Sequence, residues 1–80
     1  MNTLYLNNKQ VVITVHAIKR ARLRKIAFPD QVYNTIKTGR VVKFGKNNVK
    51  IIKKSKEGSI ICIGEDLGQI IIIKTIERGN

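Results

Sequence analysis

The stretch "SIICIGEDLGQIIIIKTI" (residues 59–76) contains two aliphatic runs joined by a short polar segment. Residues 60–63 and 70–73 do not alternate between apolar and polar side chains, which is typical of strands that are covered on one or both faces. The segment "EDLG" between them is rich in turn-forming residues and is too short for a parallel crossover. We therefore expect two central strands that run antiparallel.

Two more strands are predicted on the N-terminal side of this stretch. "RVVKF" (residues 40–44) and "VKIIKK" (residues 49–54) are extended in pattern, and the turn-rich segments "GKNN" and "SKEG" follow them. Lysine makes up half of "VKIIKK", which suits an exposed face or an edge strand. The four segments together predict a four-stranded antiparallel meander.

The first half of the chain predicts one strand and two helices. "QVVITV" (residues 10–15) is β-branched and continuous, whereas residues 16–25 have high helix propensity and no breaker. A second helix should begin at Pro29, bury Val32 and Ile36, and end at Gly39 in a left-handed conformation. The predicted fold is a single α+β domain over residues 1–80: strand, two helices, then the four-stranded antiparallel meander, with both helices packed on one sheet.

Charge is the unusual feature of the composition. The chain has 80 residues, with 16 Lys and Arg against 5 Asp and Glu, for a formal net charge of +11. Residues 16–56 hold 13 of these basic residues and a single acid, Asp30, so this segment alone carries +12. Self-repulsion of that size favours a polyanion or an acidic protein as the partner, although abundant lysine also keeps proteins soluble.

Other features of the composition limit the possible classes of function. Cys62 is the only cysteine, so neither a disulfide within the chain nor a cysteine-based zinc site is expected, and its apolar surroundings predict a buried, inert thiol. No nucleotide-binding loop, nucleophile elbow or zinc-protease motif is present, so no metal or cofactor is expected. The first residues do not resemble a signal peptide, and no apolar run is long enough to span a membrane. These features suit a cytoplasmic protein with no membrane partner.

His16, Arg20 and Arg24 follow one another at four-residue steps, so on a helix they form one polar stripe. RNA can be cleaved without metal when a base takes the 2′-hydroxyl proton, cations stabilise the phosphorane and an acid protonates the leaving oxygen. Histidine suits proton transfer and a guanidinium suits charge stabilisation, so these three residues are the catalytic candidates. The alternative is that the histidine packs where strand meets helix and the arginines are solvated.

The second proton-transfer group of such a site stays open in the sequence. The candidates are Glu65, Asp66, Tyr5, Tyr33 or a lysine. Further basic residues are expected to contact phosphate groups or to form a general positive surface. These nucleic-acid-binding candidates are Lys19, Arg22, Lys43, Lys46, Lys50 and Lys53.

The segment "HAIKRARLRKI" (residues 16–26) carries a resemblance to a known family. It is similar to the domain-of-unknown-function 4258 family, whose pattern is His, Ala, an apolar residue, Arg at the fourth and eighth positions after the histidine, and Ile at the tenth. The likeness continues through Val32, Ile36 and Gly39 and through "IIIIKT", so that it covers about residues 11–76. Members of that family resemble RelE and ParE toxins, which implies a RelE-like fold and an RNA-cleaving or otherwise toxin-like activity.

Two functions therefore remain. The first is a toxin-like, metal-independent endoribonuclease or RNA-binding domain that uses the basic helix of His16, with RNA as partner and an acidic, antitoxin-like protein as a further possibility. The second is a non-catalytic basic module that binds nucleic acid or an acidic protein.

Overall fold

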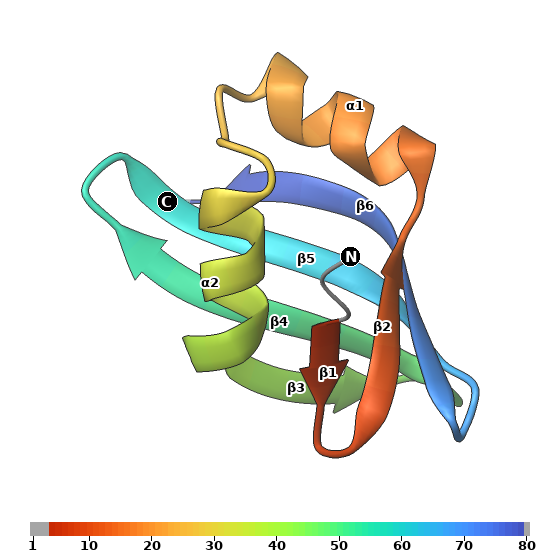
Figure 1. Cartoon of the computed structure of the whole chain (residues 1–80). Helices are drawn as coiled ribbons and strands as arrows, with labels where there is room; N and C mark the ends of the chain where they lie inside the picture. The colour runs from red at the N-terminus through yellow and green to blue at the C-terminus, as the bar shows by residue number, and fades with distance from the viewer. Residues whose placement is uncertain (1–3, 80) are drawn as a thin grey trace.

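In the computed structural model, residues 4–79 are described, and they form six strands and two helices (Figure 1). The elements in chain order are β1 (Leu4–Leu6), β2 (Lys9–Ile13), α1 (Val15–Leu23), α2 (Asp30–Thr38), β3 (Arg40–Phe44), β4 (Asn48–Ser55), β5 (Gly58–Asp66) and β6 (Ile70–Gly79). All six strands belong to one sheet, in the order β1-β2-β6-β5-β4-β3. The sheet is strongly curled, so that it forms half of a barrel.

The predicted four-stranded antiparallel meander is therefore wrong as a description of the sheet. Strands β3 to β6 are antiparallel neighbours in succession, but the sheet continues beyond them. β2 pairs with β6 in parallel, with Val11 opposite Ile71, and β1 adds an outer antiparallel strand. The sheet is mixed because residues 14–69 provide the long connection that a parallel pair requires.

The β1–β2 hairpin escaped prediction because its first strand has only three residues. Its turn is made by Asn7 and Asn8, which have φ angles of 52° and 66°. Two consecutive residues with positive φ are typical of the tight hairpin turn that matches strand twist, and asparagine tolerates this conformation well. Asn7 and Asn8 therefore form the turn that joins β1 to β2.

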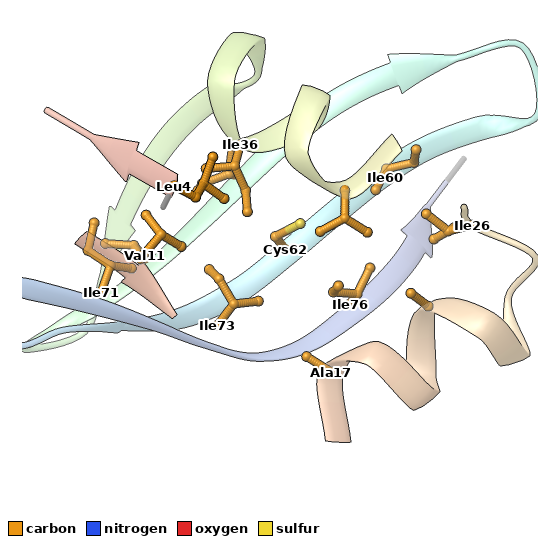
Figure 2. Packing of buried hydrophobic residues seen from close by; sticks show 14 residues of the cluster. Leu4, Val11, Ala17, Ile26, Ile36, Ile60, Cys62, Ile71, Ile73 and Ile76 are labelled. Carbon is orange, nitrogen blue, oxygen red and sulfur yellow. The ribbon is translucent and has the colours of Figure 1, made fainter. Parts of the chain in front are cut away.

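Helix α2 lies over one side of the sheet, which we call the inner face, and α1 lies along the edge of β6; the core fills the space between the helices and the sheet (Figure 2). Neighbouring strands place Ile51 opposite Cys62 and Cys62 opposite Ile76 on this face. A bulge shifts the register of β5 and β6 between Ile63 and Gly64, so that Ile73 as well as Ile76 points inward. β5 and β6 are the two middle strands of the sheet, as their aliphatic runs predict.

Helix α1 lies beside the part of β6 that extends beyond β2 (Figure 1). The Thr14 hydroxyl caps the helix by accepting a hydrogen bond from the Ala17 amide at 3.1 Å, which satisfies one of the free amides of the first turn. Ala17 and Ala21 are fully buried, and their small side chains let the helix approach the strand closely. The opposite side of α1 is exposed and carries Lys19 and Arg22 together with two apolar side chains, Val15 and Leu23.

Helix α2 buries Val32 and Ile36, as predicted, but it does not end in a left-handed residue. Gly39 has φ −75° and ψ 171°, which is an extended conformation. A Cβ atom there would lie 2.5 Å from the Thr35 carbonyl oxygen and 2.9 Å from that of Ile52. Gly39 is therefore needed for the close approach of the helix end to β4, and its conformational freedom is not used.

Candidate nucleic-acid interface

His16 and Arg20 lie next to each other on α1. The Arg20 Nε–H donates to His16 Nε2 at 3.4 Å, a long hydrogen bond between side chains one helical turn apart. His16 is exposed and Arg20 is half-buried. The imidazole and the guanidinium thus meet at the surface, where a phosphate group could reach both.

Arg24, the third residue of the predicted stripe, is turned toward the sheet. It follows the last residue of α1, and its Nη2 lies 2.6 Å from Glu77 Oε1 on β6. The Thr75 hydroxyl donates to the other oxygen of the same carboxylate at 2.8 Å. The structure brings His16 and Arg20 together, but Glu77 largely neutralises the charge of Arg24.

Three of the named candidates for a second proton-transfer group make contacts away from His16. Glu65 pairs with Lys74 at 3.0 Å, and Asp66 pairs with Lys9 at 2.7 Å. Tyr33 packs edge-to-face on Phe28 in the core, and Tyr5 is exposed on β1. Within residues 4–79, none of these side chains forms a hydrogen bond with His16.

The Asp66 carboxylate is held in its charged form at the end of β5. The hydrogen bond from Lys9 Nζ is the main cause that lowers the pKa of Asp66, and the Gly68 amide and the nearby charge of Lys43 contribute. Asp66 also lines a cavity of about 250 Å³ at the β3–β4 turn, together with Lys43, Lys46 and Asn48. This cavity does not include His16.

The predicted lysines of the β3–β4 hairpin do not share one surface. Lys43 and Lys46 line the cavity at the turn, whereas the Lys50 ammonium lies 5.7 Å from the centroid of the Phe44 ring, on the face of the sheet away from the helices. Lys53 is half-buried opposite Ile60 on the inner face. Because β-strand side chains alternate between faces, these four predicted lysines cannot form a single basic row.

The α1 candidates and the hairpin candidates border different parts of the sheet. Lys19 and Arg22 are exposed on α1, beside β6, whereas Lys43 belongs to β3 at the far edge. A nucleic acid that contacts both groups must cross β4, β5 and β6. The compact basic surface is therefore the one on α1.

Arg78 is a candidate that the sequence gives no reason to choose. Its Nε donates to the Arg24 carbonyl oxygen at 3.3 Å, which fixes it under the end of α1, and its Nη1 lies 3.5 Å from the Ser55 hydroxyl. A cavity of about 270 Å³ is lined here by Gln31, Ser55, Lys56, Glu57 and Arg78. Only the pairing of β6 with β5 brings this late residue beside the helix.

No protein-family model matches the chain, and no curated protein or solved structure is significantly similar to it. The resemblance to the domain-of-unknown-function 4258 family stays a prediction. Among residues 4–79, no three His, Cys, Asp or Glu side chains lie close enough together to hold a metal ion. In the same range, no helix has the length and apolar character needed to cross a membrane.

Proposed function

We propose that this chain is an RNA-binding domain that contacts phosphate groups through α1. The supporting observation is the charge of the helix and of the turn that follows it, which carry five cations and no acid. Of these cations, Arg24 alone forms an ion pair within residues 4–79. The cations are Lys19, Arg20, Arg22, Arg24 and Lys25.

The helix holds these groups at spacings that suit a nucleic-acid backbone. Lys19 and Arg22 are three residues apart and exposed, so they neighbour each other on the outward side of α1. Arg20 lies on the flank beside His16. Contacts of this kind do not depend on the nucleotide sequence. They weaken as salt is raised, because each neutralised phosphate releases counterions.

The simpler explanation is that cations near the C-terminal end of α1 only stabilise the helix dipole. The two explanations differ in the affinity for RNA that they predict, because only the first requires the α1 cations to contact phosphate groups. We expect a labelled single-stranded RNA to bind at low ionic strength, with log affinity falling linearly in log salt between about 50 and 200 mM. The combined variant Lys19→Gln and Arg22→Gln should bind more weakly, with a salt slope reduced by about 0.7 for each lost phosphate contact.

The control is the double variant Lys37→Gln and Lys46→Gln, which also removes two positive charges but leaves α1 unchanged. Lys37 is exposed in the last turn of α2, and Lys46 is exposed at the β3–β4 turn. Loss of affinity that depends only on net charge, equal in both double variants, would contradict the assignment to α1. The absence of binding at low salt would remove RNA as the partner.

RNA cleavage by His16 is the second candidate function, and the contact between His16 and Arg20 favours it. The hydrogen bond from Arg20 would first open, so that His16 Nε2 takes the 2′-hydroxyl proton while the freed Arg20 guanidinium stabilises the charge on the phosphorane. The 2′-oxygen then bonds to phosphorus, and the 5′-oxygen leaves and takes up a proton from water or from a further acid. His16→Ala should lower the cleavage rate by roughly 100-fold or more with little change in RNA affinity.

Arg20→Lys separates charge from geometry, because lysine keeps the charge but loses the planar two-donor fork. We expect this variant to bind RNA almost as tightly as the native chain and to cleave it more slowly. A His16→Ala variant that cleaves at the native rate would exclude the histidine. Binding without any cleavage by the native chain would leave the RNA-binding proposal alone.

A further inference from the structure

The face of the sheet away from the helices is apolar where an exposed sheet face is ordinarily polar. Cross-strand pairs place Val12 beside Ile72 and Ile52 beside Ile61 on this side. Seven apolar side chains on five strands point to this side, and Ile52, Ile61 and Ile63 form their central cluster, with Lys50, Asn48, Glu65 and Thr75 among them. We call this surface the outer apolar face. It consists of Val12, Val42, Phe44, Ile52, Ile61, Ile63 and Ile72.

No element within residues 4–79 covers this patch, because α2 packs on the inner face and α1 lies along the edge of β6 (Figure 1). Val12 is 37% exposed and Phe44 is 41% exposed, and the isoleucines are half-buried among their neighbours. Contiguous apolar patches of this kind on a folded domain mark interaction surfaces. The pairing register places these side chains outward, since a shift of one residue would bury them and expose the core.

The charges around the outer apolar face are unevenly balanced. Arg40 and Lys50 point to this side from β3 and β4, and within residues 4–79 they form no ion pair. Lys54 is exposed on the same side at the end of β4. The acids of this face, Glu65 and Glu77, are already paired with Lys74 and Arg24. An approaching surface therefore meets apolar side chains with one cation that is unpaired within residues 4–79, Lys50, between Val42 and Ile63, and with Arg40 and Lys54 at the border.

Two occupants fit this surface poorly. A second copy of the chain would bring the same cations against each other, and like charges across an interface are repulsive. Single-stranded RNA that binds on the face of a sheet stacks its bases on aromatic rings, but Phe44 is the only aromatic residue in the patch and Lys50 lies over its ring. The partner that fits this surface therefore has both apolar and acidic side chains.

We propose that the outer apolar face binds an amphipathic, acidic helix of another protein. Four strand spacings of about 4.8 Å make the patch roughly 19 Å wide, and the residues from Asn48 to Lys54 on β4 span roughly 20 Å. A helix of about 13 residues covers that length. Its apolar side would rest on Ile52, Ile61 and Ile63, and its acidic flank would meet Arg40, Lys50 and Lys54.

A synthetic peptide of about 14 residues tests the proposal, with leucines at helical spacing and glutamates on both flanks. A second peptide of identical pattern carries lysine in place of glutamate. In NMR titrations of the isotope-labelled domain, the glutamate peptide should shift the signals of Ile52, Ile61 and Ile63 and should bind more weakly as salt is raised. The lysine peptide should leave these signals unchanged.

Substitutions locate the site and control for net charge. Lys54→Glu should weaken binding of the glutamate peptide by about tenfold, as should Ile61→Thr, which keeps a β-branched residue in the strand. Lys46→Glu makes the same charge change at the β3–β4 turn, outside the outer apolar face, and should have a much smaller effect. Equal losses for Lys46→Glu and Lys54→Glu would overturn the proposal, because binding would then depend on charge alone.

Three further results would also overturn it. The glutamate peptide could leave the outer-face signals unchanged at millimolar concentration, or shift those of α1 instead. Single-stranded RNA could shift the signals of Ile61 and Ile63, which would make this face a nucleic-acid surface. Sedimentation in high salt could reveal a dimer that Ile61→Thr abolishes, which would identify the occupant as a second copy.

Discussion

The Arg24 guanidinium lies 2.6 Å from the Glu77 carboxylate and joins the end of α1 to β6. The two side chains are 28% and 33% exposed, so water screens the pair and its contribution to stability is about 1 kcal/mol or less. Its larger effect is on the charge of the α1 surface, because an acid offsets one of the five cations there. Glu77 therefore limits the positive potential next to His16 and Arg20.

Removing that acid should strengthen the binding of RNA. We expect Glu77→Gln to bind single-stranded RNA more tightly and with a salt slope steeper by about 0.7, since Arg24 becomes free to contact a phosphate. Glu57→Gln makes the same change in net charge at the β4–β5 turn and serves as the control. Anisotropy titrations across salt measure both, and equal effects would show that only net charge matters.

Lys9 and Asp66 should make stability depend on pH in the acid range. The folded state lowers the pKa of Asp66, chiefly through the hydrogen bond from Lys9, so this stabilisation is present above the unfolded pKa near 4 and is lost as pH falls through the folded pKa. Urea unfolding of the native chain and of Asp66→Asn should therefore differ most near neutral pH and converge toward about pH 2. A difference that stays constant with pH would contradict this assignment.

Cys62 should resist thiol reagents as long as the domain is folded. Burial raises the pKa of the Cys62 thiol to about 12, so almost no thiolate forms near neutral pH, and the side chain is fully enclosed. An aromatic disulfide reagent should label it only in denaturant. The double variant Cys62→Ala with Leu67→Cys should react quickly, because Leu67 is 52% exposed; fast labelling of native Cys62 would instead indicate frequent opening of the core.

Two glycines should respond to alanine for different reasons. Gly39→Ala places a methyl group 2.5 Å from a backbone carbonyl oxygen, so we expect a loss of about 3 kcal/mol in the free energy of unfolding. Gly68→Ala meets no atom within 4 Å, but its φ of +100° strains any other residue, and a loss of about 1 kcal/mol is expected. Urea denaturation gives both values, and a milder effect at Gly39 than at Gly68 would mean that the helix end can shift.

Local patterns in the sequence predict the elements well where the cause is local. The aliphatic runs of β5 and β6 mark the middle of the sheet, and Val32 and Ile36 mark the buried side of α2. The three-residue strand β1 has too few residues for a periodic signal, and the parallel pairing of β2 with β6 depends on segments far apart in the chain. The prediction of the fold class was wrong because it missed this pairing between distant segments.

The candidate site divides in the same way. Helical spacing predicts that His16 and Arg20 meet, and they do so at 3.4 Å. The partner of Arg24 is Glu77, and Arg78 reaches the end of α1 from the last strand, so tertiary pairing alone places both. The alternation of side chains along a strand does predict that Lys50 and Lys53, three residues apart, point to opposite faces of the sheet.

The parallel pairing of β2 with β6 also constrains when this domain can fold during its synthesis. Val11 is translated early, but its neighbour Ile71 is translated late. Before then the β1–β2 hairpin is an isolated ribbon, which is marginally stable in water, and α1 lacks the strand that buries Ala17 and Ala21. The ribosome must therefore release residues 70–76 before the core closes, and a nascent chain that stalls earlier exposes its isoleucines to chaperones and proteases.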